Sequence, residues 1–142
     1  MNQKELEIYI HIPFCIKKCS YCDFLSAPAT EQTVESYMAA LFAEIEGKSG
    51  KYRDRRVVSV FIGGGTPSRL TGEQMGQLMA CIRRHFFLDP AAEITTEVNP
   101  GTVSEEKLRT FRKAGINRLS IGMQSAQDEE LRELGRIHDF AG

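Results

Sequence analysis

The chain has 142 residues, of which 42% are hydrophobic and 26% charged, and this is the composition of an ordinary globular domain with a buried core. Its 18 basic and 19 acidic residues nearly cancel and leave no overall positive field that would attract nucleic acid, so we expect no nucleic-acid partner. The sequence has no basic and apolar leader and no apolar run of about 20 residues, so we expect a cytoplasmic protein without a membrane-spanning segment.

The first part of the chain predicts a strand, a helix and a second strand. Residues 6–12 are mainly β-branched and aromatic and are followed by Pro13, which is typical of a strand. Residues 57–62 are a nearly continuous apolar run, which favours a parallel strand covered on both faces. Between them, residues 31–47 predict an amphipathic helix, because apolar side chains recur at helical spacing: Val34, Tyr37, Met38, Leu41, Phe42 and Ile45.

The alternation continues with a second helix and a third strand. Thr71 and Gln74 have the spacing of a capping box, which predicts that a helix begins at Thr71. Residues 93–98 predict the third strand, which ends at Asn99-Pro100-Gly101. The apolar stripe of the second helix consists of Met75, Leu78, Met79, Ile82 and Phe86.

A third helix and a fourth strand–helix pair follow. Thr102 and Glu105 also have capping-box spacing and predict the start of the third helix, which ends at Gly115. Residues 116–121 predict the fourth strand and residues 126–136 the fourth helix. The inward side chains of the third helix are predicted to be Leu108, Phe111 and Ala114.

Four consecutive strand–helix units predict an α/β fold with a parallel sheet. The loops that follow the strands then share the carboxyl edge of the sheet, where such folds place their sites. A closed barrel of parallel strands needs more than four units. We therefore expect residues 1–142 to be one domain that forms the N-terminal part of a larger protein.

Three cysteines follow the first strand in the spacing C-x3-C-x2-C: Cys15, Cys19 and Cys22. Iron–sulfur clusters are usually held by four thiolates, so three predict a [4Fe-4S] cluster whose fourth iron is open to another molecule. A zinc site with a fourth ligand from elsewhere, or buried free thiols, are the alternatives. Cys81 lies within the second predicted helix, and we interpret it as a small packing residue.

Two further features are predicted to lie at the same edge. Residues 63–67 read Gly-Gly-Gly-Thr-Pro, and three glycines allow the backbone to approach a ligand closely. Glu97 ends the third strand, where a carboxylate can accept hydrogen bonds from ribose hydroxyls. Taken alone, the glycines fit a flexible turn equally well, and Glu97 fits an exposed charge. No Gly-Lys-Ser/Thr follows the glycines, which excludes a P-loop.

Polar residues beyond the fourth strand are weaker candidates. Gln124 follows that strand and Arg136 closes the fourth helix, and either can be plain surface. A guanidinium beside a ligand carboxylate is the functional alternative for Arg136. The three histidines, His11, His85 and His138, show no metal-ligand spacing, and we assign them no chemistry.

Taken together, residues 9–22, residues 63–67, Glu97 and residues 124–136 resemble the radical S-adenosylmethionine (SAM) superfamily. Within it, the chain resembles the group that contains oxygen-independent coproporphyrinogen III oxidase and its haem-chaperone relatives. The resemblance implies a partial (β/α) TIM-like barrel, of which this chain holds about four units. It also implies a [4Fe-4S] cluster that binds and reductively cleaves SAM.

The resemblance also implies roles for individual residues. Cys15, Cys19 and Cys22 match the cluster ligands. Gly64 to Thr66 match the loop at the methionine end of SAM, and Gln124 and Arg136 match contacts to a second SAM or to substrate. The full set of implied cofactor contacts is Tyr9, Tyr21, Gly64, Gly65, Thr66, Glu97, Gln124 and Arg136.

One departure points to a branch of the family. The decarboxylating oxidase carries a further cysteine two positions after the third, whereas this chain has Phe24 there. The resemblance therefore implies a haem chaperone, with the oxidase, another radical SAM enzyme or a non-redox metal-binding module as alternatives, so enzymatic activity stays open. The implied partners are haem or a porphyrinogen, a haem-acceptor protein, and an electron donor such as flavodoxin or ferredoxin.

Overall fold

Four parallel strands form one sheet in the spatial order β1-β2-β3-β4, and a helix follows each of the first three strands along the chain. The computed structural model describes residues 3–14 and 30–121. This arrangement confirms the predicted α/β fold; the helix predicted at residues 126–136 lies outside the described residues. The elements are β1 (Lys4–Ile12), α1 (Glu31–Ser49), η1 (Gly50–Tyr52), β2 (Arg55–Gly64), η2 (Pro67–Arg69), α2 (Gly72–His85), β3 (Phe87–Val98), η3 (Pro100–Thr102), α3 (Glu105–Ala114) and β4 (Arg118–Ile121), where η marks a short 3-10 helix.

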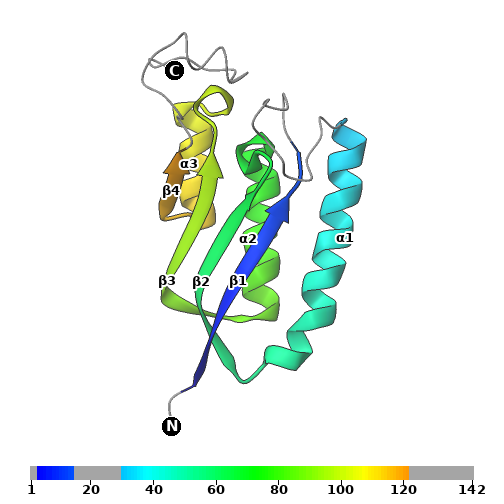
Figure 1. Ribbon diagram of the computed structural model, residues 1–142, viewed down its shortest axis with the longest axis vertical. Coiled ribbons are helices and arrows are strands. Elements are labelled where there is room, and N and C mark those ends of the chain that lie inside the picture. The colour runs from blue at the N-terminus through cyan, green and yellow to red at the C-terminus, as the bar shows by residue number, and fades with distance from the viewer. Residues whose placement is uncertain (1–2, 15–29, 122–142) are drawn as a thin grey trace.

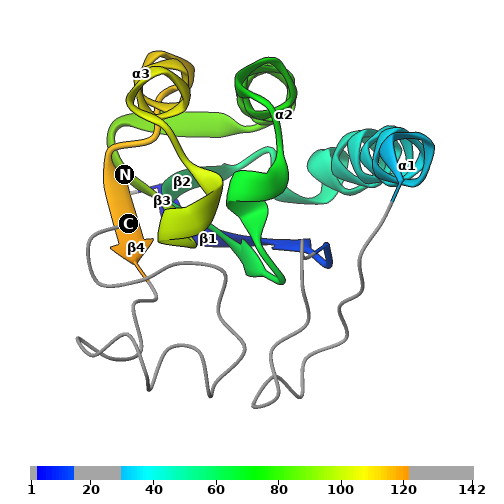
Figure 2. The ribbon, with the colours of Figure 1, turned by 90° about the horizontal axis from the view of Figure 1, so that it is seen from above.

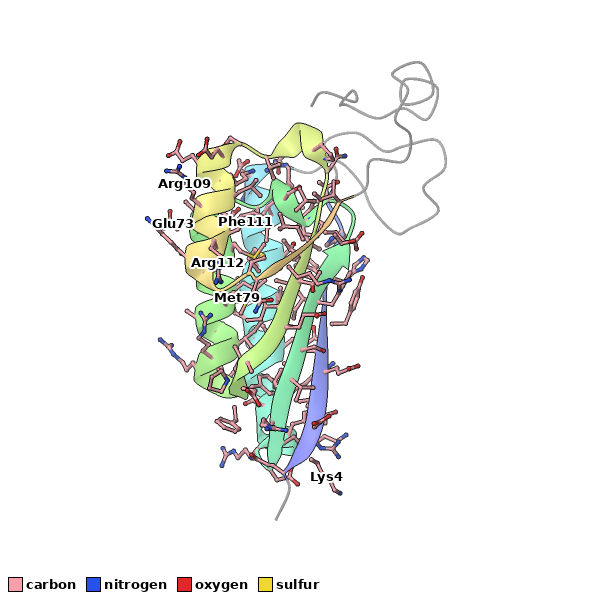
Figure 3. The ribbon with its side chains drawn as sticks, turned by 90° about the vertical axis from the view of Figure 1, so that its left-hand side faces the viewer. Lys4, Glu73, Met79, Arg109, Phe111 and Arg112 are labelled. Atoms are coloured by element: carbon pink, nitrogen blue, oxygen red, sulfur yellow. The ribbon has the colours of Figure 1, made fainter. Side chains whose placement is uncertain are left out.

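The three α-helices of the described residues cover one face of the sheet, as Figure 2 shows from above. The carboxyl ends of the strands lie together at the top of Figure 1, and we call this side of the sheet the carboxyl edge. Met79 of α2 and Phe111 of α3 are buried between helices and sheet, whereas Glu73 and Arg109 point outward (Figure 3). Within the described part, no helix is both long and apolar enough to cross a membrane.

The start of α2 confirms its predicted capping box. The Thr71 hydroxyl accepts a hydrogen bond from the Gln74 N–H at 3.0 Å, and the Gln74 side chain accepts one from the Thr71 N–H at 2.8 Å. Two donors that the helix itself cannot satisfy are therefore paired locally.

The start of α3 corrects the prediction that Thr102 and Glu105 form its cap. Ser104 is the N-cap, and its hydroxyl accepts a hydrogen bond from the Lys107 N–H at 3.1 Å. Thr102 belongs instead to η3, which begins at Pro100. Because the proline ring fixes φ, it starts a separate short turn, and the chain enters α3 only after that turn ends.

The later strands begin at residues other than those predicted. β3 begins at Phe87 rather than at residue 93, and its pairing with β2 shifts between Val57 and Ser59, so the extra residues form an irregular stretch of the strand. β4 begins at Arg118 rather than at residue 116. The Ile116 N–H cannot pair with β3, because it donates to the Phe111 carbonyl at the end of α3. Gly115, at which the helix was predicted to end, is its C-cap and has a φ of 114°.

Candidate functional site at the carboxyl edge

The glycine-rich segment holds the end of β1 by backbone hydrogen bonds. The Gly65 N–H donates to the Ile12 carbonyl at 2.7 Å, and the Thr66 N–H donates to the Phe14 carbonyl at 2.6 Å. A Cβ on Gly65 would lie 2.7 Å from the Phe14 carbonyl oxygen, so only glycine permits this approach. Phe14 directly precedes Cys15, and the segment that carries the predicted cluster ligands therefore starts from a fixed point at the carboxyl edge.

Glu97 lies over the first two glycines, as the parallel register of β2 and β3 allows. Its Oε1 accepts a hydrogen bond from the Gly64 N–H at 3.1 Å, and a Cβ on Gly63 would overlap that oxygen. Gly64 has a φ of 115°, which lies in the left-handed region that other residues avoid. The glycines thus serve two purposes: Gly64 turns the chain, and Gly63 leaves room for the carboxylate.

Tyr9 places a phenol beside this carboxylate. Its ring stacks on Phe61 with centroids 6.1 Å apart, and its hydroxyl shares a hydrogen bond of 3.1 Å with Nδ1 of His11. Partial burial, and then the negative charge of Glu97, raise the pKa of Tyr9. The hydroxyl therefore stays protonated at neutral pH and remains a hydrogen-bond donor, while the ring is 59% exposed.

His11 and Tyr37 are site residues that the sequence reasoning missed. His11 lies two positions after Tyr9 on the same face of β1, and this period-two spacing is a signal that could have indicated the pair. Tyr37 comes from α1, where it was interpreted only as part of the apolar stripe. Its hydroxyl donates to the His11 carbonyl, a contact between residues far apart in sequence that no local pattern reveals.

Side chains from η2 and α3 support the segment that follows the glycines. The Lys107 ammonium donates to the Ser68 carbonyl at 2.7 Å, and the Asn99 N–H donates to the Ser68 hydroxyl at 3.3 Å. Burial, and then the neighbouring charge of Arg69, lower the pKa of Lys107. Arg69 also pairs with Glu31 of α1 at 3.2 Å. The turn after the glycines is thus held to α1, α3 and the end of β3.

Some predicted site residues have no described position. The predicted cluster ligands Cys15, Cys19 and Cys22 lie outside the described residues. So do the predicted cofactor contacts Tyr21, Gln124 and Arg136. The structure does bring together the other five predicted contacts: Tyr9, Gly64, Gly65, Thr66 and Glu97.

Cys81 has the surroundings of a packing residue. It is half-buried against the core, and its Sγ lies 4.0 Å from the Phe42 carbonyl oxygen. Burial is the main cause that raises the pKa of its thiol, which disfavours the thiolate that binds metal. Across residues 3–14 and 30–121, no three potential ligand side chains gather around a common point.

Known proteins similar to this chain identify its family. Residues 9–141 match the family described as "Radical SAM superfamily". The chain is 45% identical over 134 residues to "Heme chaperone HemW" of Escherichia coli (strain K12), covering 94% of this chain and 35% of that protein. It is 40% identical over 141 residues to the protein of the same name from Haemophilus influenzae, covering 96% and 37%.

A solved structure shares the fold. This structure, described as "Coproporphyrinogen III oxidase (HemN) from Escherichia coli is a Radical SAM enzyme", matches with a TM-score of 0.88 and 34% identity over 96% of this chain and 32% of that one. The chain therefore spans about a third of the length of the relatives that it matches.

Proposed function

The chain belongs to the radical SAM superfamily, and we propose that it is the cluster- and SAM-binding part of a haem chaperone. The observation that carries the proposal is the convergence of a glycine cradle, a carboxylate and a phenol beside Phe14, the residue before Cys15. The relatives named as haem chaperones support the choice within the superfamily.

The described residues fit SAM by shape and by chemistry. In the glycine cradle, at Gly63, Gly64 and Gly65, a side chain would overlap Glu97, His11 and the backbone of β1, so glycine keeps the backbone of this segment uncovered at the carboxyl edge. We propose that Gly64, Gly65 and Thr66 bind the methionine end of SAM through their backbone carbonyls, because their N–H groups already donate to Glu97, Ile12 and Phe14. Glu97 on β3 would accept hydrogen bonds from the ribose hydroxyls. The Tyr9 hydroxyl on β1 would donate a hydrogen bond to SAM. These groups orient SAM along the carboxyl edge.

Three thiolates would hold the cluster in the segment that begins after Phe14: Cys15, Cys19 and Cys22. When bound, the cluster supplies a chelating iron and an electron to SAM. The described residues contribute the hydrogen bonds that hold Ile12 and Phe14, the last described residue before Cys15, against the glycine segment. We expect this chemistry in the cytoplasm, where cysteine thiols stay reduced.

Phe24 supports haem delivery over porphyrinogen oxidation, because it stands where the oxidase resembled by this sequence carries a cysteine. The higher identity to the chaperones, 45% against 34% for the oxidase structure, favours the same choice. Oxygen-independent coproporphyrinogen III oxidation remains the second candidate, since that structure shares the fold with a TM-score of 0.88. A haem-acceptor protein, and an electron donor such as flavodoxin or ferredoxin, would complete the system.

Anaerobic reconstitution of the full-length protein with iron and sulfide tests the cluster. We expect a broad visible absorption band that bleaches on reduction. Cys19→Ala abolishes the band, while Cys81→Ala leaves it intact and serves as the matched control. A colourless protein that binds zinc instead would contradict the proposal.

A second experiment separates the chaperone from the oxidase. The full-length protein is supplied with coproporphyrinogen III, SAM and a reductant under anaerobic conditions, and in a parallel sample with haem. Stoichiometric haem binding, followed by transfer to an acceptor apoprotein, is the expected result. Catalytic formation of protoporphyrinogen would show that the second candidate function is correct.

A further inference from the structure

Tyr37 connects α1 to the end of β1 through two contacts. Its hydroxyl donates a hydrogen bond to the His11 carbonyl, and its ring packs edge-on against Phe14, with centroids 5.3 Å apart and planes at 83°. The side chain is half-buried, whereas the fully buried residues of α1 are Val34, Met38, Leu41 and Ile45. Tyr37 is thus the member of the helical stripe that reaches the carboxyl edge.

The hydrogen bond has a clear physical reason. In the described sheet β1 is an edge strand, paired only with β2. The Ile12 carbonyl faces β2, since it accepts from the Gly65 N–H, and so the preceding His11 carbonyl faces the open side. An edge carbonyl that is partly buried needs a partner, and the Tyr37 hydroxyl supplies it.

The contact also reaches the proposed cofactor site through His11. The backbone of His11 is held by Tyr37, and its imidazole shares a hydrogen bond with the Tyr9 hydroxyl. The Tyr9 hydroxyl in turn feels the charge of Glu97. The Tyr37 side chain therefore contacts Phe14, the residue that precedes Cys15, and it is linked through His11 to the Tyr9 hydroxyl of the site.

We propose that Tyr37 is a positioning residue, which fixes the end of β1 through His11 and Phe14 and so sets the position of the Tyr9 hydroxyl at the glycine cradle. The proposal rests on the proposed cluster and SAM site. It predicts that the Tyr37 hydroxyl contributes to the affinity for SAM although it lies on a helix outside the cradle.

The test compares Tyr37→Phe with the wild type in the full-length, reconstituted protein. Tyr52→Phe is the matched control, because it removes the same atom from the far end of the same helical region, where the Tyr52 ring contacts Lys51 and Arg55. Three quantities are measured: iron content, the dissociation constant of SAM, and the change that SAM causes in the electron paramagnetic resonance spectrum of the reduced cluster.

We expect full iron content in all three proteins. Tyr37→Phe weakens SAM binding roughly five-fold, which is the loss of about one hydrogen bond, and alters the SAM-induced spectral change. Tyr52→Phe matches the wild type. Tyr37→Ala, which also removes the packing against Phe14, has a larger effect in the same direction.

The outcomes separate two failures. If the wild type holds no cluster or does not bind SAM, the proposed function falls and the role of Tyr37 falls with it. If Tyr37→Phe binds SAM as the wild type does, with the same spectrum, only the positioning role is wrong. A lowered melting temperature with unchanged SAM affinity also contradicts that role, since it shows a purely structural one.

Discussion

The carboxyl edge and the amino edge of the sheet are held together by different kinds of interaction. At the carboxyl edge, backbone groups of the glycine segment bond to the Ile12 and Phe14 carbonyls and to Glu97. At the amino edge, ion pairs between side chains connect the strands. Arg56 of β2 lies 2.9 Å from Asp89 of β3 and 3.3 Å from Glu5 of β1, so its two ion pairs join the first three strands.

Halfway along the sheet, just before β4 begins, the Asn117 side chain joins the last two strands. Its side-chain oxygen accepts from the Ile94 N–H at 2.8 Å, and its amide donates to the Ala92 carbonyl at 2.9 Å. This difference separates the part of the fold that stabilises the sheet from the part that carries the candidate site. Side chains join the strands at the amino edge, although the buried Nε of Arg56 has no hydrogen-bond partner among the described residues, whereas the carboxyl edge presents glycines, an exposed phenol and a carboxylate.

The largest effect is expected at the carboxyl edge from Gly65→Ala. The added Cβ meets the Phe14 backbone at 2.7–2.9 Å, and backbone cannot move aside as a side chain can. We expect loss of cluster and of SAM binding, with a fall of about 3 kcal/mol in the free energy of unfolding. Iron content and urea unfolding measure it.

Gly76→Ala is the matched control, because a Cβ there meets nothing within 4 Å. It replaces a glycine inside α2 and is expected to stabilise the protein by about 0.5–1 kcal/mol. Equal stability and iron content of the two alanine variants would contradict the need for glycine at the approach of Gly65 to Phe14.

At the start of β4, away from the carboxyl edge, Asn117→Ala is expected to lower the free energy of unfolding by about 2 kcal/mol, since it leaves the Ile94 N–H and the Ala92 carbonyl without this partner. The dissociation constant of SAM stays unchanged. Urea unfolding and anaerobic calorimetry measure the two quantities. Weaker SAM binding with unaltered stability would place Asn117 in the site and break the comparison.

Glu97→Gln sharpens the comparison, because it removes a charge at the carboxyl edge but keeps an oxygen that can accept from the Gly64 N–H. We expect SAM binding to weaken by about ten-fold, as charged acceptors bind more strongly than neutral ones, and the unfolding free energy to fall by about 1 kcal/mol because the bond from the Gly64 N–H is weakened for the same reason. Binding calorimetry on the reconstituted protein tests this. Unchanged affinity would exclude the carboxylate as a ligand.

The smallest effect is expected from Arg56→Gln. The Arg56 side chain is 37% exposed, so its pairs with Asp89 and Glu5 are partly screened by water. A loss of about 0.5 kcal/mol is expected at low salt, and it shrinks as salt rises. Arg109→Gln, which removes an exposed pair on α3, is the control and is expected to have no larger effect.

The sequence predicted the order of elements because hydrophobic periodicity and caps are local signals. Thr71 with Gln74 marked a helix start correctly, whereas Thr102 misled because Pro100 diverted the chain into η3. The irregular pairing at the start of β3 left no local pattern, because it depends on how β2 lies beside it.

The contacts within the candidate site could not be predicted from the sequence. Gly64 and Glu97 were identified separately, yet the bond between them follows from the register of β2 and β3. His11 and Tyr37 were missed because the relevant group of His11 includes its carbonyl, and a backbone acceptor has no signature in a sequence.

The hydrogen bonds from Gly65 and Thr66 to the end of β1 have one more consequence. They join the proposed SAM cradle to Phe14, the residue before Cys15, through the backbone. If the cluster strengthens the binding of SAM by some free energy, then by thermodynamic reciprocity bound SAM strengthens the binding of the cluster by the same free energy. Bound SAM is therefore expected to slow the removal of iron from the cluster by a chelator.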